Sequence, residues 1–256
     1  MNLKEKTVII TGASSGIGAA CAETFAKNGA NLILTARRID KLNKLAECLR
    51  ISYNVKIHTI EMDVRNYNDV KEKFENLPVE FKKIDILINN AGKALGIESI
   101  QDGILSNWEE MIDTNVKGLL YVSKVIIPIL IKQNYGHIIN IGSIAGHEVY
   151  QGGNVYCASK FAVNAISKAM GLDLVGNNIK VTSIDPGMVE TEFSLVRFKG
   201  NAEKAKKVYD GLTPLTGYDI ADIVLFAASR PDHVALREII VTPTAQASAT
   251  VVYRKK

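Results

Sequence analysis

Tyr156 and Lys160 stand four residues apart in a segment of helical period, so their side chains share one face of the predicted helix. A phenol is a poor base at neutral pH, but a neighbouring ammonium favours the phenolate and can lower its pKa by roughly two or three units. Such a pair suits proton transfer to or from an alcohol or carbonyl oxygen. Ser143 follows a predicted strand, His137–Ile141, and can hold the same oxygen. The alternative is a chance pair of surface residues.

A glycine-rich turn lies upstream of these residues. Thr11–Gly18 reads TGASSGIG and joins a β-branched run to a helical segment. Gly12 permits a sharp turn, Gly16 lets backbone approach a phosphate, and Gly18 lets the helix press onto the sheet. The spacing is neither GxGxxG nor a Walker A loop, and a glycine turn without a ligand is the alternative. Its position between a strand and a helix favours a nucleotide, with helix N–H groups facing the anion.

The end of the second predicted strand, Asn31–Ala36, indicates which nucleotide is bound. An NAD site has an acidic residue there for the ribose 2′-hydroxyl. Here the strand runs into Arg37 and Arg38, which suit a 2′-phosphate, and Ser14 can add one more hydrogen bond. The alternative is two solvated arginines at a helix start, which the helix dipole mildly disfavours. The sequence therefore predicts NADP rather than NAD.

Alternating strands and helices must position these residues. We expect strands at Thr7–Thr11, Asn31–Ala36, Lys56–Glu61, Ile84–Asn89, His137–Ile141, Lys180–Ile184 and Glu238–Val241, and helices at Gly16–Asn28, Arg38–Ser52, Trp108–Gln133 and Tyr156–Val175. This order predicts a doubly wound, Rossmann-type α/β fold, a parallel sheet with helices on both faces. No linker divides residues 1–256, so we expect one domain. Phe193–Gly217, with a short helix at Ala202–Tyr209, is a predicted lid, and residues 243–256 form a tail.

Composition excludes several classes of protein. The chain has 256 residues, 47% hydrophobic and 23% charged, which is globular composition. The net charge is +4, and Arg254, Lys255 and Lys256 supply three of those charges, so nucleic-acid binding is not expected. The first residues lack the apolar region of a signal peptide. The longest apolar run, Val125–Ile131, contains Pro128 and is far too short to span a membrane.

The cysteines and histidines indicate no disulfide framework and no metal. Three cysteines without a CxxC pair are typical of reduced thiols, so we expect a cytoplasmic protein. Four histidines lie far apart and lack ligand spacing, so a metal site is not expected. These residues are Cys21, Cys48, Cys157, His58, His137, His147 and His233.

Jointly, the motifs resemble those of the short-chain dehydrogenase/reductase family over the whole chain. The matching segments are Thr11–Gly18, Asp63-Val64, Asn89–Gly92 (NNAG), Asn115, Ser143, Tyr156–Lys160 (YCASK) and Pro186-Gly187. The resemblance implies strand order 3-2-1-4-5-6-7 and a catalytic set of Asn115, Ser143, Tyr156 and Lys160. It implies that Asn115 holds a water in a proton relay through Lys160. It also implies a homotetramer in which the Tyr156 helix and the long helix before it pack across a two-fold axis.

The resemblance extends the predicted cofactor site. Asp63 is expected to contact adenine, and Lys160 the nicotinamide ribose. The complete predicted set is Gly12, Ser14, Ser15, Gly16, Ile17, Gly18, Arg37, Arg38, Asp63, Val64, Asn90, Ala91, Gly92, Tyr156, Lys160, Pro186, Gly187, Val189 and Thr191.

A narrower resemblance points to the substrate. Gly152–Tyr156, Thr191–Gly200 and Thr242–Ser248 are similar to segments of NADP-dependent 3-hydroxy acid dehydrogenases, which act on serine, allo-threonine and related acids. A carboxylate substrate needs a cation, and Arg197 in the lid can supply one, although a solvated or subunit-contact arginine is the alternative. Gln246 is expected to contact substrate in a neighbouring subunit's site. With Ser143 and Tyr156, these residues form the predicted substrate site.

Two other functions remain open. One is a broad NADPH-dependent carbonyl or diketone reductase working in the opposite direction. The other is a non-enzymatic NADPH-sensing regulator on the same fold. The regulator would need the glycine loop but not the catalytic set, which is complete here.

Overall fold

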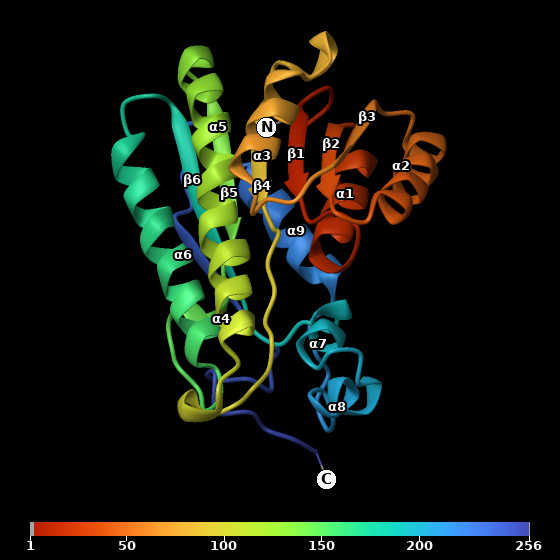
Figure 1. Cartoon of the computed structure of the whole chain (residues 1–256). Coiled ribbons are helices and arrows are strands. Elements are labelled where there is room, and N and C mark those ends of the chain that lie inside the picture. Colours follow the sequence, from red (N-terminus) through yellow and green to blue (C-terminus); the bar gives the residue numbers. More distant parts are fainter. Residues whose placement is uncertain (1–2, 256) are drawn as a thin grey trace.

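The computed structural model describes residues 3–255, and its strands form one parallel sheet (Figure 1). The sheet order is β3-β2-β1-β4-β5-β6-β7, and each neighbouring pair is parallel, which confirms the predicted fold class and strand order. The strands are β1 (Thr7–Thr11), β2 (Asn31–Ala36), β3 (Ile57–Glu61), β4 (Ile86–Asn89), β5 (Gly136–Ile141), β6 (Ile179–Pro186) and β7 (Glu238–Val241).

Helices cover both faces of the sheet (Figure 1). They are α1 (Gly16–Lys27), α2 (Ile39–Tyr53), α3 (Tyr67–Glu75), α4 (Leu105–Ile112), α5 (Gly118–Gln133), α6 (Asn154–Asp173), α7 (Glu192–Arg197), α8 (Ala202–Lys207) and α9 (Gly217–Ala228). Val8 and Ile10 of β1 pack toward α1, α2 and α9, whereas Ile9 packs toward α3, α5 and α6. A continuous β-branched strand therefore supplies a core on each face.

The predicted helix Trp108–Gln133 is interrupted in the structure. The helical stretch runs from Leu105 to Gln133, but a π-helical turn at Asp113–Lys117 separates α4 from α5. By length and composition alone this stretch could cross a membrane. In the structure Val122 and Ile126 of α5 lie in the sheet's core, as expected of a core helix in a folded domain.

The lid lies beyond the carboxyl edge of the sheet, at the lower right of Figure 1. It contains α7 and α8, whereas the sequence predicted one helix at Ala202–Tyr209. The Tyr209 hydroxyl donates to the Val189 carbonyl (2.8 Å), and Arg254 of the tail donates to the Val208 carbonyl (3.0 Å). The tail therefore ties the lid to the rest of the chain.

Candidate active site

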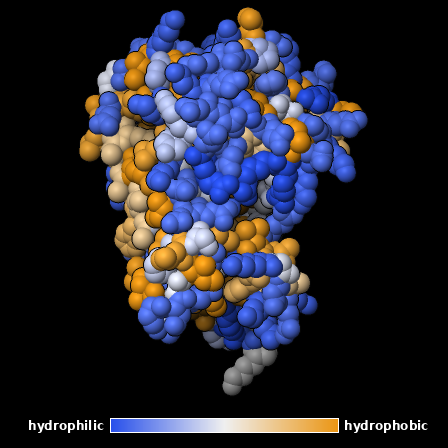
Figure 2. All heavy atoms as spheres, in the orientation of Figure 1, coloured by the Kyte–Doolittle hydropathy of each residue, from blue (hydrophilic) through white to orange (hydrophobic). Residues whose placement is uncertain are grey.

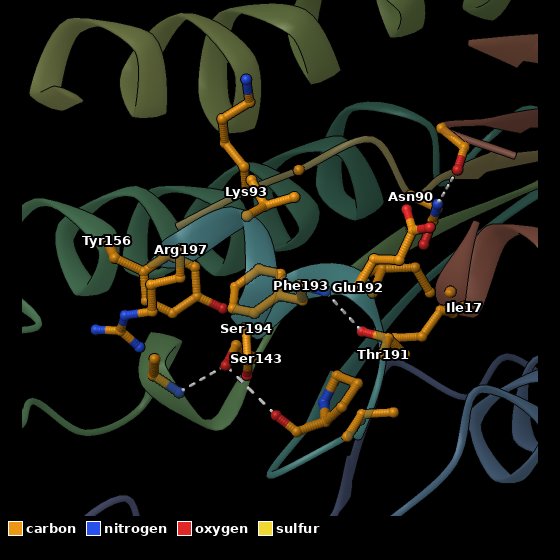
Figure 3. A pocket seen from close by; sticks show the side chains of 18 of the residues that line it. Ile17, Asn90, Lys93, Ser143, Tyr156, Thr191, Glu192, Phe193, Ser194 and Arg197 are labelled. Atoms are coloured by element: carbon orange, nitrogen blue, oxygen red, sulfur yellow. Dashed lines mark hydrogen bonds between the residues drawn. The ribbon is translucent and has the colours of Figure 1, made fainter. Parts of the chain in front are cut away.

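A cavity of about 690 Å³ lies at the carboxyl edge of the sheet, beneath the lid. Ligands bind at this edge in open parallel sheets. The cavity extends from Arg37 and Arg38 to Ser143, Tyr156 and Lys160, and Figure 3 shows its catalytic end. Among the predicted cofactor residues, all but Gly18 line the cavity.

The glycine loop has the backbone that its sequence predicts. Gly12 and Gly16 adopt φ values of +66° and +56°, which L side chains rarely tolerate. A Cβ atom on Gly12 would lie 2.9 Å from the Cα of Ala91, and one on Gly16 would lie 3.3 Å from Thr191. The loop is thus held close to the segment after β4 and to the start of α7.

Gly18 and Asn90 pack against each other and hold the glycine loop in place. A Cβ atom on Gly18 would lie 2.5 Å from the Asn90 amide nitrogen. That amide donates to the carbonyls of Thr11 (2.9 Å) and Gly12 (3.2 Å). Gly18 therefore serves close packing, as predicted, while Asn90 pins the loop that would hold a phosphate.

Arg38 is the better organised of the two predicted phosphate ligands. Its guanidinium donates to Ser14 Oγ (3.1 and 3.2 Å) and Ser15 Oγ (2.7 Å). It also pairs with Glu192 (2.8 Å), which binds Lys41 as well (2.9 Å). The hydrogen bonds from Lys41 and Arg38 lower the pKa of Glu192 to about 2. A cluster of donors therefore stands beside the glycine loop, with one carboxylate already bound to it.

Arg37 lies farther along the cavity and is more exposed. Its Nη1 is 4.0 Å from Glu110 Oε1, and its side chain is 54% exposed. Asp63, the predicted adenine contact, lines the same part of the cavity but is bound by Arg65, at 2.6 Å between Oδ2 and Nη2. Although burial acts to raise the pKa of Asp63, the hydrogen bonds from Arg65 lower it overall. The carboxylate is therefore anionic and fixed in place.

Ser143 and Tyr156 meet at the other end of the cavity (Figure 3). Tyr156 lines the same part of the cavity as Ser143 and packs edge-on against Phe193 of α7, at 5.7 Å between ring centroids. Ser143 Oγ accepts from the Ala145 amide (3.1 Å) and lies 3.4 Å from the Pro186 carbonyl. Burial raises the pKa of the Tyr156 phenol, and the Ser143 hydroxyl only partly opposes that rise.

Lys160 lines the cavity one helical turn from Tyr156. Its Nζ donates to the Ile141 carbonyl (2.9 Å). Burial lowers the pKa of Lys160 to about 8. The predicted lowering of the Tyr156 pKa is not observed, because the burial of the phenol outweighs the lowering effects of Ser143 and Arg197. The ammonium is nevertheless held at the end of β5, in the cavity that Ser143 and Tyr156 also line.

Asn115 is enclosed by protein partners. Its Nδ2 donates to the Lys93 carbonyl (2.8 Å) and to Ser159 Oγ (3.0 Å), and its Oδ1 accepts from the Lys93 amide (2.8 Å). The residue lies in the π-helical turn and outside the cavity lining. Its side chain positions the loop after β4 against α6. The predicted water relay stays a prediction.

Arg197 of α7 points into the catalytic end of the cavity (Figure 3). Its Nε donates to the Gly96 carbonyl (3.1 Å), and its guanidinium carbon lies 5.5 Å and 5.9 Å from the ring centroids of Tyr150 and Tyr156. Its Nη2 is buried and has no hydrogen-bond partner within residues 3–255. A buried cationic donor without a partner fits an anionic ligand.

Gln246 lines the cavity of its own chain. Its predicted contact with substrate in a neighbouring subunit's site stays a prediction. Its Oε1 accepts from the Met188 amide (2.8 Å), and its Nε2 donates to the Ser248 carbonyl (3.2 Å). These bonds are local because the tail turns back beside the end of β6. Gln246 thus fastens the tail under Pro186 and Gly187.

Comparison with known proteins identifies the family of the chain. A family model described as short chain dehydrogenase matches residues 6–201. An NADP-dependent 3-hydroxy acid dehydrogenase of Schizosaccharomyces pombe is 42% identical over 99% of this chain and 98% of its own. A sulfoacetaldehyde reductase 2 of Chromohalobacter salexigens is 43% identical over 94% and 95%. A solved closed form of serine dehydrogenase complexed with NADP+ is 41% identical, covers 98% of this chain and 100% of its own, and has a TM-score of 0.91. The chain belongs to the short-chain dehydrogenase family.

Proposed function

We propose that the protein is an NADP-dependent oxidoreductase that oxidises the 3-hydroxyl group of 3-hydroxy acids. Candidate substrates are L-serine, L-allo-threonine, 3-hydroxybutyrate and 3-hydroxypropionate. The observation that carries the proposal is the buried, unpartnered Nη2 of Arg197 next to Tyr156. The names of the similar 3-hydroxy acid and serine dehydrogenases support the same substrate class.

The cavity fits an NADP molecule along its length. The glycine loop offers backbone to the phosphates, and Arg38, Ser14 and Ser15 cluster where a 2′-phosphate would lie. When bound, NADP+ supplies the acceptor for a hydride. This assignment is supported by the similar serine dehydrogenase solved with NADP+ and by the similar 3-hydroxy acid dehydrogenase named as NADP-dependent.

The residues around Tyr156 divide the chemistry among them. Ser143 holds the substrate oxygen, and Tyr156 accepts the proton from the 3-hydroxyl group as the C3 hydrogen leaves as hydride. Arg197, with its guanidinium carbon 5.9 Å from the Tyr156 ring centroid, and Lys160, one helical turn along α6, provide positive charge that favours the phenolate. With serine as substrate, the product is a 2-amino-3-keto acid, which loses CO₂ spontaneously.

Arg197 recognises the substrate carboxylate in this proposal. Contacts with the Gly96 carbonyl and the Tyr150 ring orient the guanidinium, so Arg197 Nη2 is already positioned before substrate binds. Charge-assisted hydrogen bonds of this kind are stronger than neutral ones and discriminate against uncharged substrates.

The subunits are proposed to assemble into a cytoplasmic homotetramer through α5 and α6. Figure 2 shows apolar side chains along the edge of the molecule that α6 occupies. Exposed apolar residues of the two helices include Leu120, Ile131, Phe161 and Leu172. Sedimentation of the purified protein tests this, and a monomer at micromolar concentration would exclude it.

The growth of NADPH fluorescence tests the activity. The four acids are each supplied with NADP+ and with NAD+. We expect turnover of at least one acid with a strong preference for NADP+. No turnover of any acid, together with NADPH-driven reduction of ketones or diketones, would move the function to the carbonyl-reductase alternative.

A further inference from the structure

A buried carboxylate lies directly behind the catalytic end of the cavity. Asp185 of β6 is 1% exposed. A Cβ atom on Gly142 would come within 1.8 Å of Asp185 Oδ1, so the carboxylate lies against the backbone between Ile141 and Ser143. Ile141 is the residue whose carbonyl binds Lys160 Nζ. The carboxylate is thus adjacent to both the anchor of the lysine and the serine.

Hydrogen bonds hold this carboxylate in one orientation. Ser183 Oγ donates to Oδ1 (2.8 Å), and His147 Nε2 lies 3.0 Å from Oδ2. Burial raises the pKa of Asp185, and the bonds from His147 and Ser183 oppose that rise. A buried carboxyl group with two such partners is suited to remain an anion beside a cation.

The outer part of the cluster leads from Asp185 to the surface. His147 Nε2 also lies 3.8 Å from Glu238 Oε1 of β7. Glu238 accepts from Asn164 Nδ2 (2.6 Å) and pairs with Lys168 (3.3 Å), both on α6. The ligand-type atoms of His147, Asp185 and Glu238 lie within 4.8 Å of one another. Because an amide and an ammonium already bind Glu238, the cluster is better described as a charge network than as a metal site.

Asp185 is the charged group that faces Lys160 from the neighbouring strand. Tyr156 of its own helix and Ser143 of the segment after β5 line the same cavity as Lys160. Within the described chain, the carboxylate of Asp185 is the charge that opposes the effect of burial on the Lys160 pKa.

We propose that Asp185, held by His147 and Ser183, is a positioning residue that keeps the Lys160 ammonium charged at the end of β5. The inference rests on the proposed function, because it gives Asp185 a part in the same proton transfer. Asp185 touches neither substrate nor cofactor in this account. It acts through Lys160, whose positive charge favours the Tyr156 anion.

Asp185→Asn tests the proposal, because it removes the charge and keeps the shape. Competitive labelling with acetic anhydride between pH 6 and 10, read by peptide mass spectrometry, measures the ionisation of Lys160 without any substrate. In the wild type, we expect the labelling of Lys160 to have its midpoint near pH 8, since burial lowers the Lys160 pKa to about 8. In Asp185→Asn it should fall by about one unit or more. Exposed Lys124 is the internal reference, and Asp173→Asn removes an exposed charge from the same helix as Lys160 as a matched control.

The pH dependence of turnover supplies the second readout. Loss of the Lys160 charge destabilises the phenolate, so the rising limb of kcat for oxidation should move to higher pH in Asp185→Asn. The rate at pH 7 should fall about tenfold for each unit of that shift. KM for the acid should change little, and Asp185→Glu should restore part of the profile. His147→Leu, which loosens the carboxylate, should shift both readouts in the same direction by less.

Several results would overturn the proposal. An unchanged midpoint of Lys160 labelling in Asp185→Asn would overturn it. This readout needs no substrate, so it distinguishes failure of the proposal from failure of the proposed function. A kcat reduced equally at all pH values would indicate a structural role alone. A metal site would be indicated by three results together. EDTA would abolish wild-type activity, a divalent metal would restore it, and the activity of His147→Leu would not respond to metal.

Discussion

Removal of the Arg38 guanidinium should weaken NADP(H) binding without affecting NAD(H). Arg38 binds Ser14, Ser15 and Glu192, and its side chain is 44% exposed. A hydrogen bond to a charged group contributes about 1.5–3 kcal/mol, and solvent exposure favours the lower end. The 2′-phosphate must also displace Glu192, an exposed pair worth about 0.2–1 kcal/mol. The net loss in Arg38→Ala is therefore about 1 kcal/mol, or roughly fivefold in Kd.

Glu192 competes for the same guanidinium, so its removal should have the opposite effect. Glu192→Gln should tighten NADP(H) by about two- to fivefold, since the exposed pairs with Arg38 and Lys41 no longer need to break. In the Arg38→Ala background the gain should shrink, which a double-mutant cycle measures. Arg37→Ala should cost less than Arg38→Ala, because Arg37 contacts neither serine of the loop.

Fluorescence titration of NADPH and NADH at fixed ionic strength is the assay, since salt screens these exposed charges. Equal weakening of both cofactors by Arg38→Ala would refute the phosphate-binding role of Arg38. Weaker NADPH binding in Glu192→Gln would mean that Glu192 supports the site rather than competing in it.

Three further predictions concern single side chains. Tyr156→Phe should abolish turnover but keep NADPH affinity within about threefold; measurable turnover would exclude the proposed proton transfer. Asn115→Ala removes three hydrogen bonds and should cost about 2–3 kcal/mol, seen as a lower Tm; an unchanged Tm would show that the clamp on Lys93 is dispensable. Burial lowers the pKa of His137 to about 3, below its value of about 6.5 in the unfolded chain. Because only the unfolded chain binds a proton at His137 as the pH drops below about 6.5, the free energy of unfolding should fall by about 2 kcal/mol from pH 7 to pH 5. Urea unfolding should show a smaller loss in His137→Gln and the full loss in the exposed control His233→Gln.

The strands were the most predictable part of the fold. Thr7–Thr11, Asn31–Ala36 and Glu238–Val241 begin and end as predicted, because apolar runs are bounded by turn residues. The break between α4 and α5 was not predicted, since the Asn115 side chain that bonds Lys93 comes from 22 residues away. The helix α9 was missed, although Thr216 and Asp219 form a capping box at its start. That local signal could have found it.

The site shows the same division between local and distant information. The glycine loop and the Tyr156–Lys160 pair were readable because their spacing determines their geometry. Sequence could not rank Arg37 against Arg38, because the ranking depends on which arginine reaches Ser14 and Ser15 in the folded chain. The cluster around His147 joins residues from β6, β7 and α6, so only the folded chain brings them together.

The central claim is that a cation beside Tyr156 selects 3-hydroxy acids, and one matched pair of substrates tests it directly. We would compare kcat/KM for 3-hydroxybutyrate and for its uncharged methyl ester, with NADP+, in the wild type and in Arg197→Leu. The account predicts that the wild type prefers the acid by about tenfold or more and that Arg197→Leu loses this preference while still oxidising the ester. A wild type that oxidises the ester as well as the acid would contradict it.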